Sequence, residues 1–262
     1  MKELSIIIPT YKNTKFIKEC LDSISKSIKN RDVEILIGID ACIDTLDFVR
    51  SNSFDKRFNF YFFEKNSGPY IVKNTLIELT SSEDILFFDS DDIMCENMID
   101  LTIEELKNNL VVKPSYVEFI DGEQIDLNSK LIRSEGVFAI NKQVLLDFNG
   151  FEPWVCAADT DLSLRLAYKG VRFKFIDEIL FYRRVHKGGL TSRKDTGGGS
   201  DLRKKYNDII LTKKNRGPLE KLHTTSFSNI DEVDKTKVQE VNDLFVEKEK
   251  KKEVLSKILN VI

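Results

Sequence analysis

Residues 85–92 read ILFFDSDD, four large apolar residues followed at once by an acidic run. A short, continuous apolar segment of this kind is typical of a strand that is buried on both faces. Three similar segments precede it, at residues 4–8, 33–39 and 58–63, and helix-like segments lie between them. Because alternating strands and helices build a parallel sheet that is covered on both faces, we predict an α/β fold with a mostly parallel central sheet.

The segments between and after these strands carry helix and strand signals. Thr14 is placed to cap a helix. Pro69 suits the first turn of another helix, since a first-turn residue needs no amide hydrogen. Further along, the pattern predicts a helix over 159–168, followed by two strands over 171–176 and 179–185.

Polar residues follow each of the four predicted strands at its end. They are Pro9-Thr10-Tyr11, Asp40, the turn at 66–70 and the acidic run at 89–92. In parallel sheets, ligands bind beyond the carboxyl ends of the strands. The sequence therefore predicts that the four clusters converge on one edge and form a binding site there.

Composition excludes several classes of protein. The chain has 262 residues, of which 41% are hydrophobic and 32% charged, and its net charge is −3. This is enough apolar material for one catalytic-sized domain with an appendage, and it excludes a wholly disordered chain or a collagen-like fibre. No run approaches the ~18 consecutive apolar residues that a membrane-spanning helix needs. The start does not resemble a secretory signal, and the four cysteines form no CxxC pair, so we expect a cytoplasmic protein.

The charge is unevenly distributed along the chain. Residues 183–216 contain 11 Lys and Arg against 3 Asp, a balance of +8, whereas residues 1–182 carry −10. Such a basic segment can contact the phosphates of a nucleic acid, a membrane surface or a small ligand, or it can be a solvated loop and helix face. Nucleic acid is the least supported of these partners, because aromatic residues that stack on bases are missing from this basic segment apart from Tyr206.

Glycine-rich stretches near residues 188–199 mark the expected domain boundary. We predict a catalytic domain at 1–195 and a helical C-terminal extension at 196–262. The tail from Glu232 has the pattern of an amphipathic helix, which favours packing or homo-oligomer formation over catalysis.

Asp89 and Asp91 carry the sharpest chemical signal. Carboxylates at i and i+2 just after a buried strand can share one hard cation, and oxygen ligands suit Mg²⁺ or Mn²⁺. The alternative is an acidic turn that caps the next helix, where the helix dipole favours anions. Asp40 can accept a hydrogen bond from a base N–H or can cap a turn. Lys73 can reach a phosphate or be solvated.

Two further residues have both a chemical and a structural interpretation. Asp159 lies at the start of a helix, either as a cap or as a general base within reach of an attacking hydroxyl. His186 follows a strand, where it can be structural or can complete a metal shell or touch a diphosphate. In the second case the surrounding basic residues would neutralise that diphosphate; they are Arg183, Arg184, Lys187 and Arg193.

The order of these motifs resembles that of the GT-A glycosyltransferases of the large inverting, nucleotide-sugar-dependent family, family 2. The resemblance covers about residues 1–195 and rests on SIIIPTYKN, Asp40, NSGPYIVKN, ILFFDSDD, NGFEPW, DTDLSLRLAYKG and YRRVHKGGLTS. It implies a Rossmann-like nucleotide-binding sandwich and transfer of a sugar from a nucleotide-diphosphate donor, with a UDP-sugar favoured, to a saccharide or other hydroxyl acceptor.

The resemblance also implies roles for particular residues. Asp159 corresponds to the catalytic base, and Arg183 and Lys187 to diphosphate or loop residues. The metal ligands for Mn²⁺ or Mg²⁺ correspond to Asp89, Asp91 and His186. The nucleotide-binding positions correspond to Pro9, Thr10, Tyr11, Asp40, Lys73 and Ser90.

Two positions depart from the family pattern. Ala158 stands where the first acid of a Glu-Asp pair is usual, and Ala41-Cys42 follow Asp40 in place of the common Asp, Gly and Ser residues. A catalytically weakened sugar-nucleotide-binding protein is therefore one alternative. A phosphatase of the haloacid-dehalogenase type, with Asp89 as nucleophile, ranks lower because its motif normally follows the first strand. A nucleotidyltransferase also ranks lower because no Gly-rich phosphate loop follows the first strand.

Overall fold

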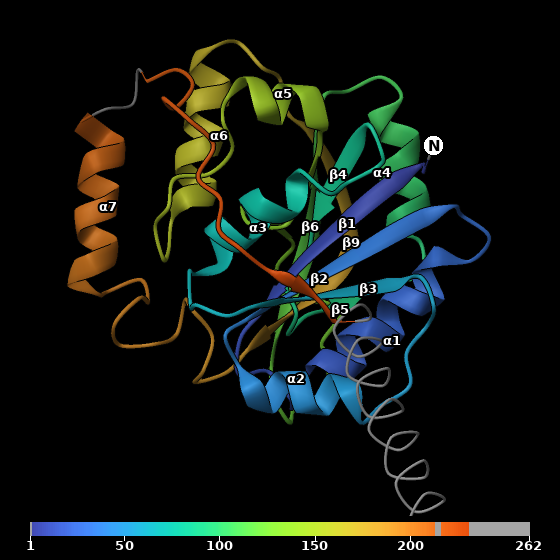
Figure 1. Cartoon of the computed structure of the whole chain (residues 1–262). Coiled ribbons are helices and arrows are strands. Elements are labelled where there is room, and N and C mark those ends of the chain that lie inside the picture. Colours follow the sequence, from blue (N-terminus) through green and yellow to red (C-terminus); the bar gives the residue numbers. More distant parts are fainter. Residues whose placement is uncertain (1, 213–215, 231–262) are drawn as a thin grey trace, which may run out of the picture. The chain divides into compact units, whose positions relative to one another are not determined.

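The structure is a computed structural model that describes residues 2–212 and 216–230 (Figure 1). The chain divides into two compact units, Met1–Phe227 and Ser228–Ile262. A two-residue strand, β10 (Ser228–Asn229), belongs to the second unit. The predicted amphipathic helix from Glu232 onward lies outside the described residues. The other described strands and helices belong to the first unit.

The N-terminal half of the sheet is parallel, as predicted. Its strands lie in the order β3-β2-β1-β4. They are β1 (Leu4–Thr10), β2 (Val33–Asp40), β3 (Phe58–Phe63) and β4 (Asp84–Phe87). The strand β1 continues through Pro9, where the sequence predicted it to stop. Because β4 pairs with β1 only as far as Ile7, the missing N–H of Pro9 faces no strand on that side.

The C-terminal half of the sheet mixes directions, and the order continues from β4 as β8-β6-β9-β5, with β7 on β6. Pairing is antiparallel except between β6 and β9. The strands are β5 (Ile93–Met94), β6 (Val111–Ile120), β7 (Ile132–Arg133), β8 (Phe138–Asn141) and β9 (Lys174–Val185). The prediction of two strands over 171–176 and 179–185 was wrong. A register shift opposite residues 114–116 absorbs the polar pair Asp177-Glu178, so β9 continues through it.

Helices cover both faces of the sheet (Figure 1). One face carries α1 (Ile17–Ile28), α2 (Ile43–Arg50) and α4 (Met98–Leu106). The other carries α3 (Pro69–Ile77), α5 (Lys142–Asp147) and α6 (Ala158–Tyr168), with α7 (Asp201–Thr212) beside α6. None of the helices in the described ranges is long and apolar enough to cross a membrane. All four cysteines lie in the described part of the chain and are free thiols.

The starts of these helices confirm one sequence prediction and correct another. Pro69 is in the first turn of α3, as predicted. Thr14 does not cap α1, because residues 14–16 first form a turn and the helix begins at Ile17 without a side-chain cap.

A buried apolar cluster joins the sheet to α3, α5 and α6. It contains Ile7 of β1, Leu36 of β2 and Phe87 of β4, together with Phe151 and Leu162. Each of the five side chains is at most 1% exposed. The cluster therefore fixes α3 and α6 against the strands whose ends carry the polar residues.

Candidate active site

The predicted convergence of polar clusters is observed. The backbone N–H groups of Ser67 and Gly68 both donate to the Asp40 carboxylate, at 2.8 Å each. Asn13, just after β1, donates to Ser90, just after β4. The carboxyl ends of β1, β2 and β4 and the start of α3 thus form one edge, as expected for parallel strands.

The acidic run divides into exposed and buried carboxylates. The side chains of Asp89 and Asp91 are 45% and 28% exposed. Asp92 is buried and accepts a hydrogen bond from the Arg184 backbone N–H at 2.9 Å. Asp91 Oδ2 lies 2.8 Å from His186 Nε2. The structure therefore brings together Asp91 and His186 from distant parts of the chain, while Asp92 has a structural role.

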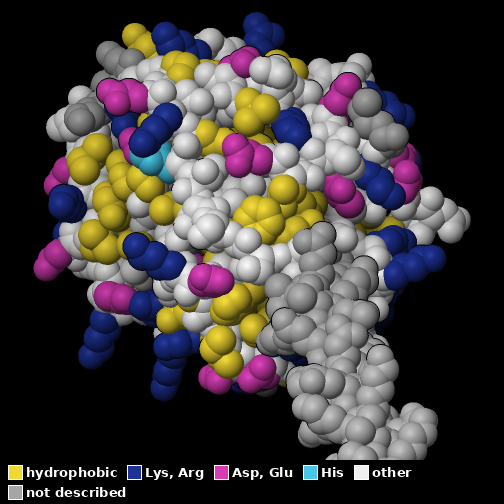
Figure 2. Space-filling model, in the orientation of Figure 1, with side chains coloured by type: hydrophobic (Ala, Val, Ile, Leu, Met, Phe, Trp, Pro, Cys, Tyr) yellow, Lys and Arg dark blue, Asp and Glu magenta, His cyan; other side chains and the backbone are white. Residues whose placement is uncertain are grey.

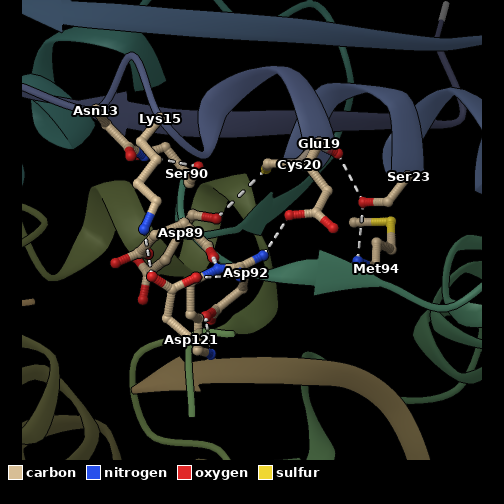
Figure 3. A network of polar contacts seen from close by, with 12 residues as sticks. Asn13, Lys15, Glu19, Cys20, Ser23, Asp89, Ser90, Asp92, Met94 and Asp121 are labelled. Atoms are coloured by element: carbon tan, nitrogen blue, oxygen red, sulfur yellow. Dashed lines mark hydrogen bonds and ion pairs between the residues drawn. The ribbon is translucent and has the colours of Figure 1, made fainter. Parts of the chain in front are cut away.

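The acidic run is held from one side by α1 and the turn before it (Figure 3). The Asn13 amide donates to the Ser90 carbonyl at 2.7 Å and to its hydroxyl at 2.9 Å. The Cys20 thiol donates to the Asp89 carbonyl at 3.5 Å, and Ser23 accepts from the Met94 N–H at 2.9 Å. These contacts fix the backbone that presents the carboxylates. Ser90, predicted to bind nucleotide, is buried within this network.

The electrostatics of the acidic run favour an added positive charge. Partial removal from water raises the pKa of Asp89 above its usual value, Asp91 and Asp159 add to this effect, and Lys73 opposes it. Burial raises the pKa of Asp92 well above its usual value, and the charges of Asp91 and Asp89 add to the rise. Carboxylate oxygens with an imidazole nitrogen suit Mn²⁺ or Mg²⁺ chemically. However, within residues 2–212 and 216–230 no three His, Cys, Asp or Glu side chains are already arranged to hold a metal ion.

Asp40 and Thr10 lie at the ends of neighbouring strands on the predicted nucleotide side. Asp40 is 3% exposed, and its burial raises its pKa, an effect that the N–H groups of Ser67 and Gly68 oppose. The Thr10 hydroxyl is buried and has no hydrogen-bond partner among the described residues. Asp40 thus caps the turn before α3, one of the two interpretations that the sequence left open.

Pro9 and Tyr11 flank Thr10 in different environments. Pro9 is buried in β1, whereas the Tyr11 side chain is 40% exposed. The Lys12 ammonium lies 5.2 Å from the centroid of the Tyr11 ring. Tyr11 is therefore the member of this group with an accessible aromatic face.

Lys73 is not a solvated lysine. Its side chain is 4% exposed, and its ammonium lies 3.7 Å from Asp89 Oδ1. The ammonium also lies 5.5 Å from the ring centroids of Tyr70 and Phe87 and 5.8 Å from that of Phe151. The cation predicted to reach a phosphate is thus enclosed by aromatic rings and paired with Asp89.

Asp159 begins α6, as predicted, and its two oxygens have different surroundings. Oδ1 accepts from the Thr160 N–H at 2.9 Å and from the Tyr70 hydroxyl at 3.0 Å. A Cβ atom added to Gly136 would lie 2.9 Å from Asp159 Oδ2 and 3.9 Å from Asp89 Oδ2. The two carboxylates therefore both border the space beside Gly136 that a side chain at this position would occupy.

The sequence placed the turn at 66–70 at the predicted site but indicated no role for Tyr70, and it did not indicate Gly136 at all. Gly136 is a single glycine in an irregular segment, so no motif distinguishes it. Tyr70 lies in the NSGPYIVKN motif, and its place just after Pro69, in the first turn of a predicted helix at the edge of the sheet, was the one sign that it is close to the site. Both residues lie next to Asp159 in the structure, and these contacts could not be predicted because Asp159 is distant from both in the sequence.

The basic residues near His186 have separate roles. Arg183 donates to Glu118 at 2.5 Å and to the Thr191 hydroxyl at 2.6 Å. Arg184 is buried and donates to the Asp91 carbonyl at 2.9 Å. Lys187 is exposed. On the face shown in Figure 2, acidic and basic side chains are interspersed, so this face presents no extended basic surface.

Residues just beyond the predicted boundary at 195 pack against residues of the predicted catalytic domain. The ring of Tyr206 in α7 stacks on that of Trp154, with centroids 4.5 Å apart and planes 5° from parallel. Arg216 pairs with Glu152 at 2.5 Å and also with Asp161. The segment up to Phe227 therefore helps to hold α6, while the division at 195 stays a prediction.

The fold and the position of the acidic edge define the GT-A class of nucleotide-sugar-binding α/β proteins. Residues 5–160 match the family described as Glycosyl transferase family 2. The chain belongs to this family. The match gives no support to a haloacid-dehalogenase-type phosphatase.

The chain is similar to individual glycosyltransferases and spans only part of the length of each. A poly(ribitol-phosphate) beta-glucosyltransferase of Bacillus spizizenii is 28% identical over 210 residues, which cover 71% of this chain and 33% of the relative. S. aureus TarS 1-349 in complex with UDP-GlcNAc superposes with a TM-score of 0.60 at 21% identity, covering 72% of this chain and 60% of that one. A Pyrobaculum calidifontis mannosyltransferase in complex with GDP-Man and Mn²⁺ gives 0.60 at 17% identity, covering 80% and 64%. At these identities the two structures establish the fold alone.

Proposed function

We propose that the chain transfers a sugar from a nucleotide-diphosphate donor, with a UDP-sugar favoured, to the hydroxyl of an acceptor. The observation that carries this proposal is the space beside Gly136. Asp159 Oδ2, from the start of α6, and Asp89 Oδ2, from the end of β4, both border it. This proximity supports a reaction in which Asp159 acts at the acceptor end of the transferred sugar and Asp89 at its diphosphate end.

The donor's nucleoside would bind at the ends of β1 and β2. The unpartnered hydroxyl of Thr10 supports this assignment, because a buried polar group without a partner is costly unless a ligand satisfies it. Tyr11 offers an exposed aromatic face to the base. Asp40 already accepts two N–H groups, but each carboxylate oxygen has two lone pairs and can accept a further donor. Pro9 and Ser90 would shape the same edge through their backbone.

The diphosphate would lie next to Asp89, Asp91 and His186, the residues that would hold Mn²⁺ or Mg²⁺. When bound, such an ion stabilises the charge that develops on a leaving diphosphate. The buried Lys73 would keep Asp89 ionised. Arg183 and Lys187 would add positive charge on the solvent side of the diphosphate. The mannosyltransferase solved with GDP-Man and Mn²⁺ supports the use of a divalent metal.

Asp159 would act as the general base. The acceptor oxygen attacks the anomeric carbon and forms the new C–O bond as the bond from that carbon to the diphosphate oxygen breaks. The acceptor proton passes to Asp159, and we assign it to Oδ2 because Oδ1 already accepts two hydrogen bonds. Attack from the side opposite the leaving group inverts the anomeric configuration. The acceptor would be a saccharide or a polyol phosphate, the latter suggested by the name of the Bacillus relative.

The test combines donor binding and donor turnover. Thermal shift with UDP-sugars and GDP-sugars, each with and without Mn²⁺, identifies the donor, since a ligand that binds only the folded state raises the melting temperature. Release of UDP or GDP from the donor that binds then measures turnover, with Asp159→Asn compared against wild type. We expect Asp159→Asn to bind the donor normally and to lose turnover. Binding without turnover by the wild-type chain would instead favour a sugar-nucleotide-binding protein, and wild-type turnover by Asp159→Asn would remove Asp159 as the base.

A further inference from the structure

The residue before the proposed base is not an acid in this chain. Ala158 is 0% exposed and belongs to the apolar cluster between the sheet and α3, α5 and α6. An alanine there can neither donate to nor repel the neighbouring carboxylate. The side chain before Asp159 therefore contributes nothing to the orientation of its carboxylate.

Tyr70 supplies such a group from α3. Its hydroxyl donates to Asp159 Oδ1 at 3.0 Å. The other donor to this oxygen among the described residues is the N–H of Thr160, which belongs to the same helix turn as Asp159. Tyr70 is thus the side chain that ties the carboxylate to a different element. With both donors on Oδ1, Oδ2 faces the space beside Gly136.

The ring of Tyr70 is held rigidly. Its side chain is 6% exposed, and the ring lies 5.4 Å from that of Phe151, centroid to centroid. Tyr70 is also the second residue of α3, and Asp40 fixes the start of that helix through the N–H groups of Ser67 and Gly68. The hydroxyl therefore has little freedom to move away from Asp159.

The hydroxyl also stays protonated. Burial raises the pKa of Tyr70 well above its usual value, and the charge of Asp159 adds to the rise. A tyrosine in this state is a neutral donor throughout the working pH range of an enzyme. It can hold a carboxylate in place without supplying a competing negative charge.

We propose that Tyr70 is the positioning residue of the base: its hydroxyl fixes Asp159 Oδ1 so that Oδ2 is presented to the acceptor hydroxyl. This inference rests on the proposed role of Asp159. In this chain the residue before Asp159 is an alanine, and Tyr70 of α3 is the side chain that orients the Asp159 carboxylate.

The experiment compares Tyr70→Phe, Asp159→Asn and the double variant in the donor-turnover assay. Tyr70→Phe keeps the ring and removes only the hydroxyl. We expect kcat to fall by about 10- to 100-fold, the range for a misplaced catalytic group, while the KM for the donor stays within about twofold. The double variant should be no slower than Asp159→Asn alone, because residues that act as one unit are not additive. Tyr168→Phe, on the exposed side of α6 at 52% exposure, is the matched control and should equal wild type.

Any other result contradicts either the positioning role of Tyr70 or the proposed role of Asp159. If Asp159→Asn is inactive and Tyr70→Phe turns over like wild type, the positioning role is wrong and the proposed function stands. If the double variant is much slower than Asp159→Asn, or if Tyr70→Phe raises the donor KM instead of lowering kcat, Tyr70 does not act through Asp159. If Asp159→Asn keeps wild-type turnover, both the base and its positioning residue are wrong. A melting temperature for each variant separates these effects from a loss of folding.

Discussion

The ammonium of Lys73 lies 3.7 Å from Asp89 Oδ1, and the side chain of Lys73 is only 4% exposed. A buried cation of this kind is costly unless it is paired, and its partner carboxylate is the first residue of the acidic run. The same helix, α3, presents Tyr70 to Asp159. Side chains of the one helix α3 thus contact both Asp89, on the proposed diphosphate side, and Asp159, on the proposed acceptor side.

Replacing Lys73 tests the first of these connections. Lys73→Met keeps the apolar stem among the aromatic rings and removes the charge next to Asp89. We expect donor turnover, measured as kcat/KM, to fall by about tenfold or more, because the carboxylates of the acidic run lose a charge that favours their ionised form. Lys26→Met, at an exposed position on α1, is the control and should not change turnover. Unchanged turnover in Lys73→Met would show that the pair is not needed.

Gly136→Ala tests the space between the two carboxylates. The new Cβ would lie 2.9 Å from Asp159 Oδ2, closer than real Cβ atoms approach an oxygen, so the carboxylate must move. We expect kcat to fall by about 100-fold, the cost of a displacement of about 1 Å at a catalytic group, with the melting temperature nearly unchanged. Gly198→Ala is the matched control, since a Cβ there meets nothing within 4 Å. A fully active Gly136→Ala would mean that this space is not where the chemistry takes place.

A buried charge network supports α6 and gives a prediction about stability. Asp161, with 3% of its side chain exposed, accepts from Arg165 at 2.8 Å and also pairs with Arg216. Arg165 is 1% exposed and donates to the carbonyls of Phe148 and Gly150. Asp161→Ala leaves two guanidinium groups without this carboxylate. We expect the free energy of unfolding to fall by about 3–5 kcal/mol, the usual effect of breaking a buried ion pair.

Urea denaturation measures this loss. Glu64→Ala, which removes an exposed carboxylate just after β3, serves as the comparison and should leave the denaturation midpoint where it is. Equal midpoints for wild type and Asp161→Ala would show that the network does not stabilise the fold.

Asp100 gives a prediction about pH. Hydrogen bonds from Lys29 and Arg31 lower the pKa of Asp100 below its usual value of 3.8. A carboxyl group whose pKa is lower in the folded state adds stability above its unfolded pKa and loses this contribution as the pH falls through the folded value. Asp100→Asn should therefore reduce the free energy of unfolding at pH 7 by about 1 kcal/mol, a small effect because the group is partly exposed.

The difference between wild type and Asp100→Asn should shrink as denaturation is repeated at pH values falling below 3.8. Asp22→Asn, which breaks an exposed pair with Lys18, controls for the general effect of removing one surface charge. A difference that stays constant with pH would contradict the assignment.

The sequence alone determined the parallel half of the sheet and the edge at which its polar residues gather. This was possible because the buried strands are continuous apolar runs, and because the carboxyl ends of parallel strands necessarily lie on the same side. The spacing of Asp89 and Asp91 just after a strand can be read from the sequence, and so can the position of Asp159 at the start of a helix, because both depend only on residues close by in the chain. The continuous strand β9 was not predictable, because the polar pair Asp177-Glu178 interrupts its pattern and only pairing with β6 carries the strand through.

Only the tertiary structure decided which side chains meet across the site. Tyr70 and Asp159 are 89 positions apart, and His186 and Asp91 are 95 apart, so no local pattern contains either contact. The same holds for Lys73: the sequence suggests that it reaches a phosphate, but only the tertiary structure shows that it is buried among three aromatic rings next to Asp89. Residue type and spacing specify what chemistry is available. The packing of α3 and α6 on the sheet specifies which of those groups act together, because it sets distances that the sequence does not contain.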